Sequence, residues 1–533
     1  MIGQNTFSQS VNKIVLMTNF RTLLPDTISM INMLNDSFEN EGYKLLLLSH
    51  KVSEELHCNT IQIPFSLKDY SKINIDYLDI NYNPNLISID AEFNEDKEID
   101  FSLYEKGLKK CSAFAHWITK EVKPAISLLW SGTVPQSIIF KQVFSEYFIP
   151  TFYIERGLLA ESLMIDESGN GALSSLKLHV DLNNNSSTYR QQYEILKNYY
   201  LEHKIDKHEQ PNYVNAEDFI QEKKISGRKI ILFVGQWDVA SGVNSQYDYQ
   251  SMLNSPYFKN TEDAFRELVK IIQEKNNLVL IFKPHPFDQN NYEILNSEKI
   301  IVDKKLNIRT LLEAADIISV MSSTVQYEAL FYEKPIVLLA NSFLSGHNIA
   351  YSILHRLQLE SVLDEALNRV GFEEKIENGK IFISRIAESY LLSLNDQNPL
   401  PFSLNNAINK LLNKYSVPDI PQYSLHELNL LTAKINAILS KETNNKLVTE
   451  SLIKANELIN ANEYYEAKKI LVHILSKIAP DSIDAANDLA VCEILLGNYN
   501  EAENLLLQIL GADPANDYAV SNYKYLKTLT EKR

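Results

Sequence analysis

The sequence predicts an α/β protein with two Rossmann-like domains facing a cleft, followed by an all-α module. Three observations carry this prediction. Short apolar segments alternate with amphipathic helices over most of the chain, a polar stretch at residues 183–212 interrupts this alternation once, and the last hundred residues are helical and repetitive. Uncharged strands between helices are typical of a parallel sheet that is covered on both faces.

In the first block, strands are predicted at residues 13–17, 43–49, 125–130 and 151–154, and helices at 26–40, 101–122 and 135–147. Residues 74–98 are rich in Asn and Asp, and we expect an irregular insertion there. The polar stretch at 183–212 contains a long helix and is expected to carry the chain between domains. The first domain is therefore predicted to span residues 1–210.

The second block begins near residue 211 and is predicted to end near residue 415. Its predicted strands are 229–234, 277–282, 300–302, 317–320 and 335–339, with helices at 261–274, 307–314 and 325–332. In doubly wound sheets a ligand binds beyond the carboxyl ends of the strands. We therefore expect the site in the cleft between the two domains.

Residues 425–533 are predicted to form helical repeats. Tyr-Tyr-Glu-Ala at 464–467 recurs as Tyr-Asn-Glu-Ala at 499–502, and Pro480 recurs as Pro514, 34 residues later. This period resembles tetratricopeptide repeats, with 430–458 as a further helical hairpin. A generic helical bundle is the alternative. Either one is a module for docking a protein partner or for spacing, without chemistry of its own.

Composition restricts the function. The chain has 533 residues, 22% of them charged, and a net charge of -17, which is unfavourable for general binding of nucleic acid or anionic membranes. The three cysteines, Cys58, Cys111 and Cys492, form no CxxC pair, which argues against a disulfide framework and a structural zinc site. The first residues lack a signal-peptide pattern, and no apolar run reaches about 20 residues. We expect a cytoplasmic protein, at most peripheral to the inner face of the membrane.

The strongest local motif is Lys283-Pro284-His285-Pro286, directly after a predicted strand. Lys283 offers a point charge, and His285 offers a directional donor on a backbone stiffened by proline. This pattern indicates a phosphate site. The alternative is a turn in which the histidine caps a neighbouring helix.

A second motif lies at the next strand-to-helix junction, where Ser322, Ser323 and Thr324 precede the predicted helix 325–332. Hydroxyl residues at this position are good N-caps, which is the simplest interpretation. The same junction can also present backbone N–H groups to an anion. Glu328 lies one helical turn deeper, where its carboxylate could accept hydrogen bonds from a ribose. Together the two motifs indicate a nucleotide site.

These motifs, in this order, resemble those of the bacterial capsule and lipopolysaccharide Kdo transferases, GT-B enzymes that use CMP-Kdo. Two further elements match. Glu155-Arg156-Gly157, followed by the 166–170 segment Asp-Glu-Ser-Gly-Asn, resembles the family's Glu-x-Gly element, and Gly235-Gln236 with the following Asp238 resembles its Gly-Gln loop. The resemblance covers residues 10–400 and does not reach the repeats.

The sequence departs from the family pattern after Gln236. Many members have an Asp four residues beyond the glutamine, where this chain has Ala240. Asp238 and Asp248 are the two candidates for that role. We prefer Asp238, because it is closer to the end of the strand.

The resemblance implies a mechanism. CMP would leave the anomeric carbon of Kdo, and Lys283, His285 and the helix start at 322–324 would stabilise the phosphate. In the β-Kdo enzymes, which retain the donor stereochemistry, Asp238 would form a covalent adduct and Glu155 would act as general base on the acceptor. The alternatives are a turn-capping role for Asp238 and an ion pair of Glu155 with Arg156 or another neighbour. No cofactor and no metal are expected, because no Asp-x-Asp triplet occurs.

The expected partners are CMP-Kdo, a lipid-linked glycan acceptor and a protein bound by the repeats. Two other functions stay open. One is a transferase with another cytidine-activated donor, CMP-sialic acid or CDP-glycerol. The other is an inactive transferase core that serves as an assembly scaffold.

Overall fold

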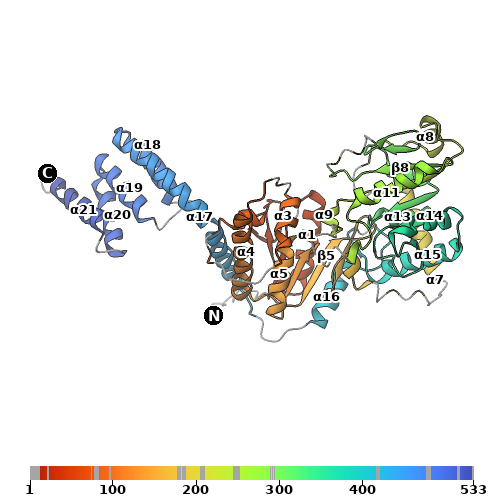
Figure 1. Cartoon of the computed structure of the whole chain (residues 1–533). Helices are drawn as coiled ribbons and strands as arrows, with labels where there is room; N and C mark the ends of the chain where they lie inside the picture. Colours follow the sequence, from red (N-terminus) through yellow and green to blue (C-terminus); the bar gives the residue numbers. More distant parts are fainter. Residues whose placement is uncertain are drawn as a thin grey trace, which may run out of the picture. The chain divides into compact units, whose positions relative to one another are not determined.

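The computed structural model describes residues 13–530 apart from several short stretches. Outside the description lie 1–12, 21–22, 74, 77–82, 95, 97, 177–179, 181, 183–187, 204–209, 244–252, 289, 291, 293–294, 396, 416–420, 476–481, 513–515 and 531–533. The described chain forms two compact units, Met1–Ser71 with Asp76–Ala433 and Lys72–Ile75 with Lys434–Arg533. Both sheets belong to the first unit (Figure 1).

The first sheet has seven strands in the order β13-β6-β5-β4-β1-β2-β3. Five of them are parallel, while β6 and β13 run antiparallel to their neighbours. Its strands are β1 (Lys13–Asn19), β2 (Tyr43–Ser49), β3 (Asn59–Gln62), β4 (Ile126–Trp130), β5 (Thr151–Arg156), β6 (Ser162–Asp166) and β13 (Leu392–Ser393). Its helices are α1 (Pro25–Asn40), α2 (Leu67–Tyr70), α3 (Asn85–Phe93), α4 (Phe101–Val122), α5 (Pro135–Glu146) and α16 (Leu404–Lys414).

The second sheet has six strands, all parallel, in the order β12-β11-β10-β7-β8-β9. Its strands are β7 (Lys229–Val234), β8 (Leu278–Lys283), β9 (Ile300–Val302), β10 (Ile317–Val320), β11 (Ile336–Leu338) and β12 (Tyr351–Ser352). The helices around it are α7 (Thr188–Glu202), α8 (Ala216–Glu222), α9 (Asp238–Ser241), α11 (Thr261–Glu274), α12 (Ile308–Ala314), α13 (Val325–Phe331), α14 (Leu359–Leu367) and α15 (Phe372–Ser389). The predicted pair of Rossmann-like domains, the GT-B arrangement, is confirmed.

The chain crosses between the two domains more often than a simple division at residue 210 or 415 would give. α7 packs on α15, and the hydroxyl of Tyr193 in α7 donates to the carbonyl of Leu330 in α13 at 2.9 Å. After α15 the chain returns to the first sheet, where Leu392 in β13 pairs with Leu163 in β6. The apolar face of α16, including Ile408, then joins the core beneath β1 and β4. The predicted 211–415 range thus contains β13 and α16, which the structure places with the first sheet.

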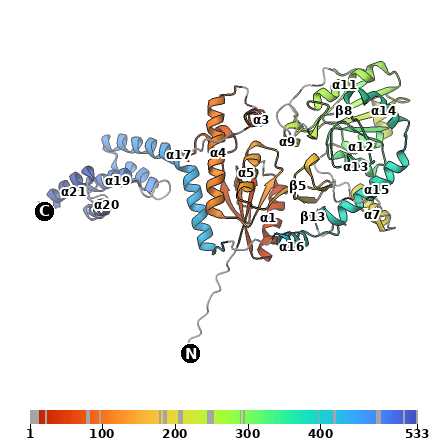
Figure 2. The same cartoon turned by 60° about the horizontal axis from the view of Figure 1, so that its bottom comes forward.

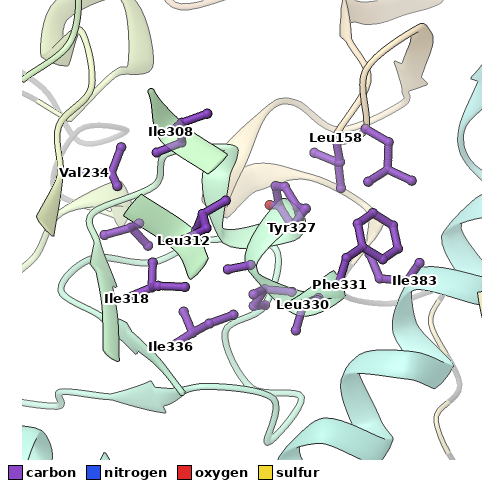
Figure 3. Packing of buried hydrophobic residues seen from close by; sticks show 14 of the residues in the cluster. Leu158, Val234, Ile308, Leu312, Ile318, Tyr327, Leu330, Phe331, Ile336 and Ile383 are labelled. Atoms are coloured by element: carbon purple, nitrogen blue, oxygen red, sulfur yellow. The ribbon is translucent and has the colours of Figure 1, made fainter. Parts of the chain in front are cut away.

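The connection between β5 and β6 inserts into the core of the second domain. Leu158, 2% exposed, and Leu159, 1% exposed, belong to the same buried cluster as Leu312 of α12 and Phe331 of α13. Figure 3 shows Leu158 beside Tyr327 and Phe331. Burying a leucine side chain stabilises a fold by about 1.5–3 kcal/mol, so this connection couples the two sheet domains.

One predicted irregular segment is partly helical. Residues 74–98 contain α3, which buries Leu86, Ile87 and Ile89 on one face. Asp90 on the same helix is fully buried and accepts hydrogen bonds from the backbone N of Leu67 at 2.7 Å and from Nε2 of Gln136 at 2.6 Å. The expectation of an irregular insertion was wrong here, because the Asn/Asp content hid a short amphipathic helix.

The C-terminal helices are α17 (Leu425–Asn460), α18 (Tyr464–His473), α19 (Ile483–Leu495), α20 (Tyr499–Ala512) and α21 (Asp517–Thr530). The repeated alanines are both fully buried, Ala467 in a core formed by α17, α18 and α19, and Ala502 in a core formed by α19, α20 and α21. Residues 430–458, expected to be a hairpin, lie in the single long helix α17. Pro480 and Pro514 lie outside the described residues.

Candidate functional site

Gln236 connects the carboxyl ends of two neighbouring strands of the second sheet. It follows β7 and is 5% exposed. Its Oε1 accepts hydrogen bonds from the backbone N and the Oγ of Ser322, which follows β10, both at 2.9 Å. Its Nε2 donates to Oδ1 of Asp238 at 3.3 Å. Residues predicted from two separate motifs therefore meet at one amide side chain.

The Lys-Pro-His-Pro turn lies against the same strand end. A Cβ placed on Gly235 would be 3.2 Å from the backbone N of His285 and 3.2 Å from Cα of Pro284. Contacts this close to backbone atoms are hard to relieve, so glycine lets the two loops approach each other. The ends of β7, β8 and β10 thus gather the second-domain candidates, as the sequence predicted for a doubly wound sheet.

Lys283 is the last residue of β8 and is 8% exposed. Its Nζ donates to the carbonyl of Lys304 at 2.9 Å. Burial lowers the pKa of the Lys283 ammonium, and the nearby charge of Asp303 opposes that effect. An anion brought beside this ammonium would stabilise the charged form, which suits a phosphate-binding role.

His285 is oriented by the backbone that follows it. Its Nδ1 accepts a hydrogen bond from the N–H of Phe287 at 3.1 Å. This bond assigns the proton of the neutral ring to Nε2, the nitrogen that could donate to a phosphate oxygen. Pro286 lies in the exposed turn between these two residues.

The segment 322–324 leads into α13, but it does not form a conventional cap. Thr324 is the N-cap residue and makes no side-chain cap hydrogen bond. The backbone N–H of Gln326 donates to the carbonyl of Ser323 at 3.1 Å. The backbone N–H of Tyr327 donates to the carbonyl of Thr324 at 3.0 Å. The hydroxyl of Thr324 therefore does not cap α13.

Glu328 lies on α13, partly exposed, one turn beyond Thr324. It lines a narrow cavity of about 20 Å³ together with Leu159, Tyr200 and Arg309. This volume suffices for about one water molecule and is too small for a ribose. A ribose at Glu328 would require this cavity to widen.

Glu155, the first-domain candidate, is in β5 opposite Met164 of β6. Its Oε1 accepts from the backbone N of Arg156 at 3.2 Å. The guanidinium of Arg156 is paired instead with the carboxylate of Asp26, at 2.8 and 3.0 Å. Burial alone would raise the pKa of the Asp26 carboxyl, but Arg156 and the hydrogen bonds from Thr27 together lower it below its usual value. The alternative of a Glu155–Arg156 side-chain ion pair is thus wrong, and Asp26 is a partner that the sequence analysis missed.

The rest of the Glu-x-Gly element is structural. The N–H of Gly157 donates to the carbonyl of Ser162 at 2.7 Å, and a Cβ on Gly157 would be only 1.8 Å from Oγ of Ser162. Asp166 accepts from the backbone N of Gly169 at 3.0 Å and from the hydroxyl of Tyr390 at 2.8 Å. These contacts close the β5–β6 hairpin and fix the loop after it.

Asp238 is held at the start of α11. Its Oδ2 accepts from the backbone N of Thr261 at 2.8 Å, and its Oδ1 accepts from Oγ1 of the same residue at 2.5 Å. Burial raises the pKa of Asp238 to about 6, against the hydrogen bonds from Thr261 and Gln236, which lower it. The capping role weighed from the sequence is therefore present, and it leaves a carboxylate at neutral pH. Asp248 lies outside the described residues.

The candidates are not all connected. Within the described part of the chain, no hydrogen bond joins Glu155 to the second-domain residues. A ring contact does link the domains near them, because Phe93 of α3 stacks on Trp237 with 5.4 Å between ring centroids. The sequence analysis did not single out Phe93, since it expected an irregular segment there.

The described residues contain neither a group arranged to hold a metal ion nor a helix that could span a membrane. No group of three or more His, Cys, Asp or Glu side chains is arranged to hold a metal ion. None of the described helices is both long and apolar enough to cross a membrane.

Two parts of the chain match models of known protein families. Residues 227–343 match the model of the family CDP-Glycerol:Poly(glycerophosphate) glycerophosphotransferase, and residues 458–524 match the tetratricopeptide repeat. The first match includes every second-domain candidate but not Glu155, and it spans less than half of the chain. The second confirms the predicted repeats. No curated protein matches.

Several solved structures are similar at low identity. The Thermosulfurimonas dismutans KpsC, beta Kdo 2,7 transferase, is 17% identical, with a TM-score of 0.37 and coverage of 57% of this chain and 89% of that one. The KpsC beta Kdo 2,4 transferase from the same organism is 18% identical, with a TM-score of 0.38 and coverage of 54% and 87%. The S. aureus MnaA–UDP structure is 11% identical, with a TM-score of 0.33 and coverage of 76% and 96%. These similarities leave the donor and the reaction open.

Proposed function

We propose that this protein is a transferase that takes its transferred group from a cytidine-activated donor, and that the donor is CMP-Kdo. The observation that carries the proposal is the gathering of Gln236, His285 and Ser322 at the carboxyl ends of β7, β8 and β10. A nucleotide phosphate at this edge would meet an imidazole donor, a nearly buried ammonium and the start of α13. The acceptor would be a glycan hydroxyl, in capsule or lipopolysaccharide O-antigen synthesis.

The chemistry needs stabilisation of the departing phosphate. When CMP leaves the anomeric carbon of Kdo, the C–O bond breaks and negative charge grows on the phosphate. Donors fixed beforehand in a partly buried site stabilise such charge better than water does, because they need no reorganisation. Lys283 and His285 are assigned this role. No metal is required in this scheme, and none of its steps uses one.

Two carboxylates would complete a double displacement with retention. Asp238, as a carboxylate, would attack the anomeric carbon and form a covalent Kdo adduct. Glu155 would then take the proton from the acceptor hydroxyl as that oxygen displaces Asp238. The hydrogen bonds from Thr261 orient Asp238. Each carboxylate oxygen has two lone pairs, so Oδ2, which accepts only the bond from the backbone N of Thr261, keeps one for attack.

A second candidate donor is CDP-glycerol, which the match of residues 227–343 favours. In that reaction the acceptor hydroxyl attacks the phosphorus that bears glycerol, and CMP leaves from the phosphoanhydride. Both donors therefore release CMP, and the same phosphate site would serve either one. A CMP-sialic acid donor would use it in the same way. The scaffold alternative predicts no release.

The experiment compares CMP release from CMP-Kdo and from CDP-glycerol, with the CMP-Kdo generated in situ. His285→Ala is expected to slow release from the true donor by roughly 100- to 1,000-fold, the cost of one stabilising donor. Release from CMP-Kdo alone supports the first proposal, and release from CDP-glycerol alone supports the second. The absence of release from either, in a folded protein, contradicts both.

The setting of the reaction is part of the proposal. A nucleotide-activated donor places the reaction in the cytoplasm, and a lipid-linked acceptor would bring it to the inner face of the membrane. The tetratricopeptide repeats are suited to binding a protein at that surface, because stacked helical pairs present an extended groove.

A further inference from the structure

A series of aromatic rings runs between the two sheet domains at the candidate site. On the first-domain side, His50 lies at the end of β2 and its ring is 4.6 Å from that of Phe65, which is 6.0 Å from Phe93. Phe93 stacks on Trp237 of the second domain at 5.4 Å with an interplanar angle of 18°. Figures 1 and 2 both show α3 and α9 side by side, with Trp237 immediately before α9.

The series continues to the phosphate candidates. The rings of Phe287 and Trp237 make a T-shaped contact with 5.5 Å between their centroids. The ring centroid of His285 lies 5.4 Å from that of Phe287. The backbone N–H of Phe287 also donates to Nδ1 of His285. Trp237 therefore contacts the residue whose backbone N–H orients the His285 ring.

The first-domain end of the aromatic series is fixed by hydrogen bonds. Phe93 is the last residue of α3, and α3 is fixed by the buried carboxylate of Asp90, which accepts from the N–H of Leu67 and from Gln136. The amide of Gln136 also donates to the carbonyl of Phe65 at 3.0 Å. Phe65 and Phe93 are thus held by one buried network.

The second-domain end of the aromatic series is also fixed by hydrogen bonds. Trp237 lies between Gln236, which is bonded to Ser322, and Asp238, which is bonded to Thr261. The carbonyl of Trp237 accepts from both the N–H and the hydroxyl of Ser241, at 2.9 and 2.8 Å. Stacked aromatic pairs are favourable beyond the burial of their surface, so the pair of Phe93 and Trp237 links two hydrogen-bonded segments.

We propose that Trp237 is a positioning residue, and that its stack with Phe93 sets the placement of Asp238 and His285 relative to the first domain. The stack would act as a clasp between the domains: when Phe93 is in place, Trp237 and Phe287 hold the carboxylate and the imidazole for reaction. Loss of the ring at residue 93 would leave both groups present but loosely placed. Misplacement of about 1 Å costs on the order of 100-fold in rate.

The clasp is testable without any ligand, because the chain has only three tryptophans, Trp117, Trp130 and Trp237. In a Trp117→Phe/Trp130→Phe chain, Trp237 is the only tryptophan, and its fluorescence can be excited selectively over that of tyrosine. Phe93→Ala is expected to shift its emission to longer wavelength and to increase quenching by acrylamide, since one face of the indole becomes exposed. Phe93→Tyr keeps the ring and is expected to restore both values. Phe101→Ala is the matched control, because Phe101 is 59% exposed at the start of α4.

Donor turnover gives the second measurement, and this part rests on the proposed function. Phe93→Ala is expected to lower kcat for CMP release by roughly 10- to 100-fold, with little change in the KM for the donor. Phe93→Tyr should recover most of that loss, and Phe101→Ala should cause none.

The outcomes separate the two proposals. Emission that is unchanged in Phe93→Ala, or a kcat loss no larger than that of Phe101→Ala, overturns the clasp. If the wild-type protein turns over neither donor, the proposed function fails, and the emission measurement still decides the clasp. If Trp130→Phe unfolds the chain, 5-fluorotryptophan labelling of the otherwise unchanged protein gives the same information, with the Trp237 resonance identified by Trp237→Phe.

Discussion

Gln236 accepts two hydrogen bonds from Ser322, each 2.9 Å long, across residues that are 86 positions apart in the chain. One amide thereby fixes the end of β7 to the end of β10. Its nitrogen also reaches Asp238, so the same side chain connects the phosphate candidates with the proposed nucleophile. The predictions below begin from this residue.

Gln236→Leu is expected to destabilise the protein by about 1–3 kcal/mol, because the N–H of Ser322 would be left without its acceptor in a buried site. Gln236→Glu keeps the acceptor and should retain more of this stability. It also places a second carboxylate beside Asp238, which should raise the pKa of Asp238 further. Urea denaturation of both variants measures the effect. Equal stability of the Leu variant and the wild type would contradict the assigned role.

Asp238 gives the proposed reaction a pH dependence. Because burial raises its pKa to about 6, the carboxylate needed for attack is formed as the pH rises through that value. CMP release should therefore increase between pH 5 and pH 7. Asp238→Asn, which keeps an acceptor for Thr261, should abolish the covalent adduct seen by intact-protein mass spectrometry. An adduct that persists in this variant would exclude Asp238 as the nucleophile and direct attention to Asp248.

The same pKa predicts a stability effect of defined sign. The folded state holds the proton of Asp238 more tightly than the unfolded chain, whose pKa is near 3.8. The stability contributed by this group is therefore present below that pH and is lost as the pH rises through about 6. Asp238→Asn lacks this dependence. Denaturation curves at pH 4 and pH 7 should show the variant gaining stability relative to wild type at the higher pH, and the opposite change would contradict the burial of this carboxyl.

Leu158→Ala is expected to cost about 2–5 kcal/mol, since it opens a cavity where the β5–β6 connection enters the second domain. Leu158→Met conserves most of the volume and should cost less than about 1.5 kcal/mol. Thermal unfolding monitored by circular dichroism compares the two. A similar loss in both variants would indicate that Leu158 is not packed as Figure 3 shows.

A truncated chain tests where the repeats begin. The first compact unit extends to Ala433, and the hydroxyl of Tyr423 donates to the carbonyl of Val122 at the end of α4 at 3.1 Å. A chain that ends at Ala433 should keep donor turnover, whereas one that ends at Pro418 loses this contact and should be less stable. Loss of turnover in the Ala433 chain, with its fold intact, would show that the repeats belong to the catalytic unit.

Much of the fold was predictable because buried parallel strands have a clear sequence pattern. The strands at 43–49, 229–234, 300–302 and 317–320 and the helices at 101–122 and 261–274 have the predicted bounds. The short edge strands β12 and β13 were missed, since two residues carry no detectable period. α3 was hidden by the Asn- and Asp-rich residues around it.

The site was predictable only within single motifs. Strand ends with Lys, His and Ser indicated an anion site, and Gln236, which matched a family motif, proved to connect Ser322 with Asp238. The pairing of Arg156 with Asp26, 130 residues apart, depends on the sheet order and has no local signal. The same holds for Phe93 and Trp237, which meet only because the two domains pack together.

The most direct test of the central claim is a crystal structure of the protein with CMP. The phosphate is expected to lie within hydrogen-bond distance of His285 and of the 322–324 segment, with the cavity at Glu328 widened around the ribose. CMP bound elsewhere, for example in the cavity of about 310 Å³ beside Tyr351 and Lys375, would contradict it. The absence of bound CMP at millimolar concentration would contradict it as well.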